Sequence, residues 1–304
     1  MIATENVNRT LTPPRTRVLG AMLLAIVALS FSSIFITRLE LEGVPPLAIA
    51  FYRMLFATAL LAPWTLGLQG RELVLLTRRE LGLLMLGGCC LAIHFGAWIT
   101  SLKYIPISTS VVLVNSHPVF VVLASHLFLG ERPNSRSLAG TAAGLVGMIV
   151  ISRDSFRDLS VAFLGDGLAI VGALAVVGYF IVGRKVRSRV SLLGYATPLY
   201  AVCSMLLLVW LLLRGDSLYP YPLPVWEYLL ALAIVPTILG HTVFNWALKH
   251  VRPSAVSVAF LGEPLVASAL AFLFFAQRPP VWTIVGGALV LLGIYLTTSS
   301  REGR

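Results

Sequence analysis

Long apolar runs separated by short polar loops dominate the chain between residues 18 and 298. A helix needs about 20 mostly apolar residues to cross a bilayer. Strands of a membrane barrel would be about half as long and would alternate apolar with polar residues, which these runs do not do. The pattern therefore predicts ten membrane-spanning helices and no barrel. The expected spans are roughly Val18–Thr37, Pro45–Leu68, Leu81–Leu102, Ile107–Leu129, Arg136–Ser152, Val161–Gly183, Ser191–Leu213, Val225–Leu248, Pro253–Phe275 and Val281–Thr298.

Part of this pattern occurs twice. When residues 102–152 are aligned without a gap on residues 248–298, 13 of the 51 positions are identical. The matches include residue types that an apolar composition would rarely align by chance: Lys103/Lys249, Pro118/Pro264, Arg132/Arg278, Gly140/Gly286 and Gly147/Gly293. The first and sixth spans also share Leu-Gly and Phe-Ile pairs, at 19–20 and 164–165 and at 35–36 and 180–181.

The repeat predicts the domain organisation. We expect a cytoplasmic N-terminal segment at 1–17, a first five-helix repeat at 18–152, a second at 153–300 and a cytoplasmic tail at 301–304. Because five is odd, the second repeat would cross the membrane in the opposite direction to the first. The fold class is thus an all-α membrane protein, a 5+5 inverted-topology repeat around a central cavity. Inverted repeats are typical of secondary transporters, although a duplication kept only for stability is the alternative.

Composition supports a polytopic membrane protein. The chain is 58% hydrophobic, has a mean hydropathy of +0.88 and is only 12% charged, about half the charged fraction of a soluble domain. The net charge of +10 would suggest nucleic acid in a soluble protein. Here the basic residues lie mainly in loops, and a cytoplasmic N-terminus places 16 Lys and Arg residues on the cytoplasmic side and 6 on the other, with Arg53 inside a span. This distribution predicts that both termini are cytoplasmic. The first apolar run is too long for a signal peptide.

Two histidines occur at related places in the two repeats. His94 precedes Trp98 by four residues in the third span, and His241 precedes Asn245 by four in the eighth. Side chains four residues apart share one helix face. We expect both histidines to line a cavity, against the alternative of a hydrogen bond to a neighbouring helix.

Two mid-span prolines also have polar neighbours. Asn115 and His117 precede Pro118 in the fourth span, and Glu263 precedes Pro264 in the ninth. A proline breaks the helical hydrogen-bond ladder and can form a hinge or a binding element. Glu263 is the clearest mid-membrane carboxylate, and it could carry a proton, bind a substrate ammonium or form an ion pair with Arg53 or a histidine. We assign possible coupling or gating roles to this group.

Arg53 lies about nine residues inside the second span, where a charge is costly. It could bind a substrate carboxylate or hold helix-end carbonyls together. Four aromatic residues are further candidates for the cavity, although core packing is the default for each: Tyr52, Trp98, Tyr179 and Trp246.

Other classes of protein lack support in the sequence. There is no P-loop and no HExxH motif. No Ser/His/Asp arrangement, regular arginine ladder or potassium-filter loop is readable. Three cysteines within apolar runs indicate neither a disulfide framework nor a zinc site. We predict no catalytic residues, no metal and no cofactor.

The ordered set of motifs resembles the EamA type of the drug/metabolite transporter superfamily. The motifs are Leu102-Lys103, Pro118, Leu129-Gly130-Glu131-Arg132, Gly140, Gly147 and Pro264. Within the superfamily the chain looks most like bacterial amino acid exporters, particularly the YddG-type aromatic amino acid exporters. The resemblance implies export from the cytoplasm across a bacterial inner membrane, by alternating access and without a bound cofactor. The second half departs from the pattern, because Ala276-Gln277-Arg278 replaces the Gly-Glu-Arg turn.

The expected function is export of amino acids, including aromatic ones, and related metabolites from the cytoplasm. Trp98 and Tyr52 would hold the substrate side chain, while His94, Asn115, His241 and Asn245 would bind its amino and carboxylate groups. Pro118 and Pro264 would be flexing points, and one chain would suffice as a monomer. The alternatives are an exporter of drugs, sugars or nucleosides and, in another class, a non-transporting membrane enzyme or assembly partner.

Overall fold

The computed structural model describes residues 15–120, 134–153, 161–187, 189–247 and 262–299, and this part of the chain contains helices and no strand. The helices are α1 (Arg15–Leu41), α2 (Pro46–Val74), α3 (Arg78–Ser101), α4 (Ile107–Val114), α6 (Ser135–Ile151), α8 (Val161–Val186), α9 (Leu192–Arg214), α10 (Leu223–Leu232), the π-helix η1 (Ala233–Thr242), α11 (Val243–Ala247), α13 (Gly262–Phe275) and α14 (Val281–Ser299).

Six continuous helical segments among the described residues are long and apolar enough to cross a membrane, and three shorter helices are also apolar. The six are Thr16–Leu41, Pro46–Val74, Arg78–Ser101, Val161–Gly183, Leu192–Arg214 and Leu223–Ala247. The shorter ones are Leu138–Ile151, Gly262–Phe275 and Val281–Gly293. The turn at Glu131 and Arg132 lies outside the described residues.

Some helix ends differ from those expected. α2 continues six residues past Leu68, to Val74. α3 begins at Arg78 because Thr77 and Glu80 form a capping box, in which each side chain accepts a hydrogen bond from the other's backbone N–H. Capping signals sit outside the apolar run, so hydropathy alone places the ends too far inward.

The expected fourth span is interrupted next to its proline. α4 ends at Val114, and the helix resumes at residues 117–120. Pro118 has no N–H to donate to the Val114 carbonyl four residues earlier. His117 Nδ1 lies 3.3 Å from that carbonyl oxygen, and Ser116 Oγ donates to the Leu113 carbonyl at 2.6 Å. Side chains thus satisfy the carbonyls that the break exposes.

The expected eighth span contains a π-helical segment that the sequence analysis did not predict. η1 lies between α10 and α11 and includes Pro236. Because Pro236 cannot donate to the carbonyl of Leu232, that oxygen is open to another donor. The hydroxyl of Thr237 donates to it at 3.0 Å. π-helical turns occur frequently at functional sites.

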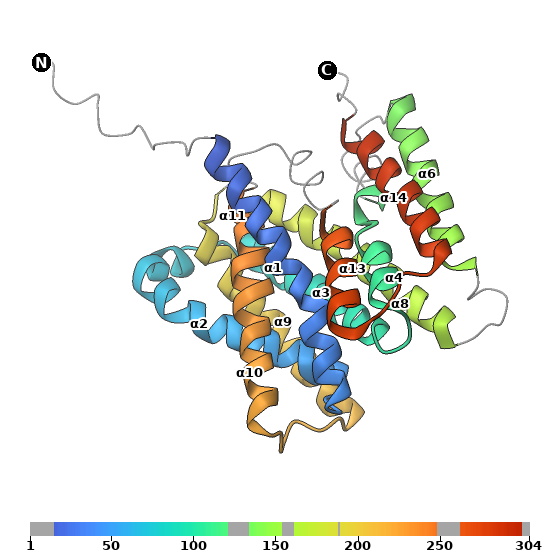
Figure 1. Cartoon of the computed structure of the whole chain (residues 1–304). Helices are drawn as coiled ribbons and strands as arrows, with labels where there is room; N and C mark the ends of the chain where they lie inside the picture. The colour runs from blue at the N-terminus through green and yellow to red at the C-terminus, as the bar shows by residue number, and fades with distance from the viewer. Residues whose placement is uncertain (1–14, 121–133, 154–160, 188, 248–261, 300–304) are drawn as a thin grey trace, which may run out of the picture.

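α6 and α14 lie side by side at one flank of the molecule (Figure 1). Glycines allow this approach, because a Cβ on Gly147 would meet the carbonyl oxygen of Gly286 at 2.6 Å and one on Gly293 would meet that of Gly140 at 2.6 Å. Since Gly140 and Gly286 are repeat-related, as are Gly147 and Gly293, the two contacts are equivalent. Gly140, early in α6, meets Gly293, late in α14, and Gly147, late in α6, meets Gly286, early in α14. The two helices are therefore antiparallel.

The other main helix pairs also join a helix of the first repeat to a helix of the second. α2 packs against α9, and α4 against α13, so each of these pairs joins a helix to its repeat counterpart. α3, the third span of the first repeat, packs against α8, the first span of the second. Correspondingly, α1, the first span of the first repeat, packs against the α10–η1–α11 segment, the third span of the second. Thr65 Oγ1 lies 2.6 Å from Thr197 Oγ1, and Glu72 accepts a hydrogen bond from the backbone of Ser191. α2 and α9 are therefore also antiparallel.

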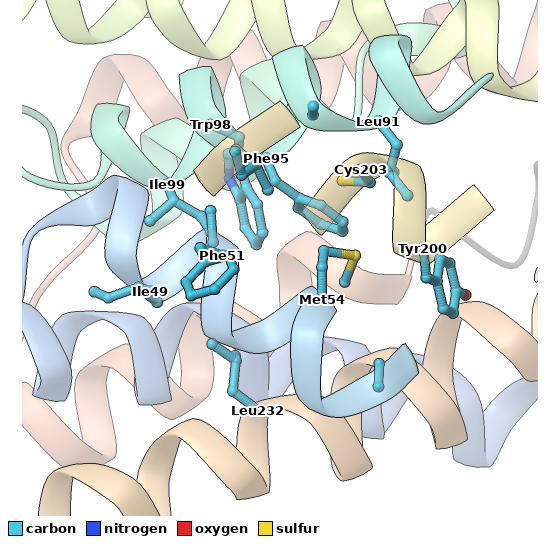
Figure 2. Close-up of a cluster of buried hydrophobic side chains, with 14 of the residues drawn as sticks. Ile49, Phe51, Met54, Leu91, Phe95, Trp98, Ile99, Tyr200, Cys203 and Leu232 are labelled. Atoms are coloured by element: carbon cyan, nitrogen blue, oxygen red, sulfur yellow. The ribbon is translucent and has the colours of Figure 1, made fainter. Parts of the chain in front are cut away.

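The main apolar core lies where α2, α3 and α9 meet. Figure 2 shows Phe95 and Trp98 of α3 directed toward Phe51 and Met54 of α2. All four side chains are buried. Trp98 also lines the cavity described next, so the core and the cavity adjoin along α3.

Candidate functional site

A small cavity of about 30 Å³ lies among helices from both halves of the chain. Its lining combines apolar side chains with buried polar ones: Leu29, Ser32, His94, Trp98, Val114, Asn115, His117, Val176, Phe180, His241 and Glu263. A cavity needs roughly 10–15 Å³ on this measure to hold one water molecule. The cavity in this conformation therefore accommodates one or two waters and is too small for an amino acid.

All three histidines expected at the site line this cavity. His94 Nδ1 is 2.9 Å from the carbonyl oxygen of Gly172 in α8, and its ring stacks on Trp98 at 6.0 Å between centroids. His241 meets the ring of Phe95 edge-on at 5.7 Å. His94 thus combines the two alternatives considered for it, since it bonds a neighbouring helix and also lines a cavity.

Glu263 and Asn115 meet at the cavity from opposite halves. Asn115 Nδ2 donates to the carbonyl of Val111 at 3.0 Å, and the Asn115 and Glu263 side chains both line the cavity. Both side chains are buried, as are Pro118 and Pro264 beside them. The α4 break places Asn115 here, because its side chain satisfies a carbonyl at the interrupted end of the helix.

Arg53 lies one layer behind the cavity, with 0% of its surface exposed. Its Nε donates to Thr237 Oγ1 at 2.8 Å and its Nη1 to Ser32 Oγ at 2.9 Å. The guanidinium carbon lies 4.2 Å from the centre of the Phe95 ring. Within the described part of the chain, Nη2 has no hydrogen-bond partner, and no ion pair within 4 Å joins Arg53 to Glu263. The pairing considered for these two residues is absent from this conformation.

Four of the eight residues expected to bind the substrate or line the cavity do not line it in this conformation. The Tyr52 hydroxyl donates to the carbonyl of Leu218, and its ring packs on Trp226 at 5.0 Å, in an aromatic cluster near the 215–222 loop. Asn245 donates to the Tyr179 hydroxyl at 2.7 Å, and Trp246 packs beside α1. The i+4 spacing of His241 and Asn245 therefore does not bring both to the cavity, because the Asn245 amide is bonded to Tyr179 of α8 instead.

The sequence analysis missed several residues at or behind the cavity. Ser32 joins the cavity lining to Arg53, Thr237 anchors Arg53 on η1, and Phe180 lines the cavity from α8. The run of Ser30, Ser32 and Ser33 in an apolar span is a signal that could have indicated Ser32. Nothing in the local sequence distinguishes Phe180 from other core aromatics.

The polar groups of the cavity are not arranged as a metal centre. Among the described residues, no three His, Cys, Asp or Glu side chains are grouped closely enough to hold a metal ion. What the arrangement offers is a set of hydrogen-bonding groups at the interface of the two halves, backed by an arginine.

Comparisons with known proteins agree with this architecture. The EamA-like transporter family matches the chain twice, at residues 17–153 and 163–299. An uncharacterized transporter of Archaeoglobus fulgidus is 29% identical over 92% of this chain and 98% of its own. The pseudopaline exporter of Pseudomonas aeruginosa is 25% identical over 93% and 97%. A "probable amino-acid metabolite efflux pump" of Escherichia coli is 22% identical over 94% and 96%.

The fold has also been observed in a crystal. One crystal structure aligns with a TM-score of 0.65 over 93% of this chain and 96% of that chain. The sequences are 19% identical, so this match shows likeness of the fold alone.

Proposed function

Because this chain belongs to the EamA-like transporter family, we propose that it exports amino acids, including aromatic ones, and related small metabolites across the bacterial inner membrane. The observation that carries the proposal is a cavity with buried polar groups at the interface of two repeated halves. Secondary transporters built from repeats bind their substrates at such an interface. The name of the Escherichia coli relative supports an amino-acid-like substrate.

The proposal includes ten spans in a 5+5 inverted repeat, with repeats at 18–152 and 153–300. It is supported by α6 and α14, which are counterparts in the repeat and run antiparallel through equivalent glycines. Counterparts that run antiparallel are expected only when one copy is inverted. In this proposal both termini are cytoplasmic, which the excess of Lys and Arg in the loops on that side supports. Lys185 is exposed, and this orientation places it on the cytoplasmic side. If a Lys185→Cys variant reacts with a membrane-impermeant thiol reagent added outside the cell, the orientation is overturned.

The size of the cavity supports alternating access. At about 30 Å³ it must expand to admit an amino acid, so substrate binding requires the halves to move apart. Pro118 and Pro264 adjoin His117 and Glu263 of the lining and would act as the flexing points. Trp98 and Phe180 would contact the substrate side chain. No cofactor enters the proposed cycle, a monomer contains both halves, and the partners are the bilayer and the small-molecule substrate, not nucleic acid.

Counterflow in proteoliposomes tests the proposal. Vesicles loaded with an unlabelled amino acid should take up labelled threonine, methionine, phenylalanine or tryptophan transiently above the equilibrium level, and protein-free vesicles should not. Exchange of sugars, nucleosides or drugs but of no amino acid would favour the alternative exporter. If no solute is exchanged, the chain is not a transporter of the proposed kind, and a non-transporting role would replace it.

A further inference from the structure

The hydrogen bonds around the cavity determine which polar groups remain to meet a substrate. His94 Nδ1 lies 2.9 Å from the carbonyl oxygen of Gly172. A carbonyl can only accept, so Nδ1 must carry the hydrogen. In a neutral imidazole the other nitrogen, Nε2, is then an acceptor. His94 lines the cavity, and within the described part of the chain no hydrogen bond joins Nε2 to another residue.

The same reasoning fixes the amide of Asn115. Its Nδ2 faces the carbonyl of Val111, which can only accept, so the nitrogen and oxygen of the amide are unambiguous. Among the described residues, Oδ1 makes no hydrogen bond, so this acceptor is left for a ligand.

Among the described residues that line the cavity, Glu263 is the one with a carboxyl group. Its side chain lines the cavity and is buried, yet no cation lies within 4 Å of it among the described residues. Arg53 is bonded to Ser32 and Thr237, and His94 is bonded to Gly172. Two further histidines, His117 and His241, line the same cavity. A buried carboxylate without a cation is unfavourable, because ionised groups in an apolar interior need a partner of opposite charge.

We propose that the face formed by Glu263, Asn115 and His94 is the ammonium subsite of the transport cavity. All three residues offer acceptors, and an ammonium is a cation with three donors and no acceptor. Trp98, stacked on His94, adds the face of an indole ring, which attracts cations. This inference rests on the proposed function, and it narrows the substrates to molecules that carry a protonated amine.

Competition on the wild-type protein tests the subsite directly. Counterflow of labelled phenylalanine is measured with three competitors: phenylalanine, phenylalaninamide, which keeps the ammonium but lacks the carboxylate, and 3-phenyllactate, which has a hydroxyl in place of the ammonium. Phenyllactate should compete about 10- to 100-fold more weakly than phenylalaninamide, because it loses charge-assisted hydrogen bonds to Glu263.

Two outcomes would contradict the proposal in distinguishable ways. Phenyllactate that competes as well as phenylalaninamide, while phenylalanine is exchanged, overturns the ammonium subsite and leaves the exporter intact. Absence of phenylalanine exchange overturns the proposed function for this substrate and the subsite with it. Neither measurement depends on a variant that folds.

A charge-neutral variant gives an independent measurement. Glu263→Gln keeps the shape of the side chain and should weaken competition by phenylalaninamide about tenfold, while competition by phenyllactate changes less than about twofold. Glu227→Gln, at an exposed position on α10, is the matched control and should alter neither. The measured ratio is the potency of phenylalaninamide as a competitor divided by that of phenyllactate. If folded Glu263→Gln has the same ratio as the wild type, the proposal is overturned. If that variant does not fold, Asn115→Ser is measured in its place and should also lower the ratio.

Discussion

Replacing Gly147 with valine is expected to lower the free energy of unfolding by about 3 kcal/mol or more, at the upper end of overpacking effects. A Cβ at this position would meet the carbonyl oxygen of Gly286 at 2.6 Å and the backbone nitrogen of Val290 at 2.8 Å. Both are backbone atoms of α14, so no rotamer change can relieve the overlap. The two helices would have to separate along their contact. Thermal melting of the purified protein in detergent measures the effect.

The matched control is Gly167→Val in α8. A Cβ there would meet nothing within 4 Å, so the substitution introduces the same β-branched residue into a helix without a clash. Its effect should be limited to the difference in helix propensity, which is below about 1 kcal/mol. Equal melting temperatures for the two variants would show that the α6–α14 contact does not contribute the expected stability.

Arg53→Lys is expected to have the second largest effect, a loss of about 2 kcal/mol together with a clear decrease in export. The guanidinium bonds Ser32 of α1 and Thr237 of η1 simultaneously and lies over Phe95 of α3. An ammonium is a point charge and cannot reproduce this planar fork. The loss of one such bond within a membrane protein costs roughly 0.6–1.7 kcal/mol. Melting temperature and counterflow rate measure the two consequences.

Arg214→Lys provides the control for this substitution. Arg214 is 62% exposed at its side chain and pairs with Asp216 at 3.5 Å, and such surface pairs contribute little. Arg53→Met distinguishes geometry from charge, since replacing a buried charge by an apolar residue of similar volume is often neutral. A methionine variant that is as stable and as active as the wild type would show that the guanidinium is dispensable.

The structure changes the interpretation of Arg53. The sequence left two roles open, a substrate carboxylate or helix-end carbonyls. The bonds found are to two hydroxyls instead, because Pro236 leaves the Leu232 carbonyl to Thr237 and the Thr237 oxygen can still accept from Arg53. One nitrogen, Nη2, has no partner among the described residues. Arg53 thus acts as a tie between helices of both halves close to the cavity.

Much of the candidate site could be predicted from spacing and residue type. His94, Trp98, Asn115, His117, His241 and Glu263 all line the cavity. They could be recognised because polar groups are costly in a membrane unless they face a partner or a cavity. Tyr52 and Trp226 could not be assigned in this way. Both are amphipathic, so an interfacial position, a cavity and an aromatic cluster are equally compatible with their sequence context.

The sequence by itself determined the class of protein, the duplication and the family, since these depend on apolar length, repeated prolines and glycines, and motif order. Tertiary structure alone decided which polar groups meet. His241 lines the cavity while Asn245, four residues later, bonds Tyr179 of α8. The break before Pro118 places Asn115 at the same cavity as Glu263, which is 148 residues distant in the chain. Which distant side chains come into contact depends on the register and crossing of the helices. Register and crossing are set by packing between segments far apart in the chain, so a local sequence pattern cannot predict them.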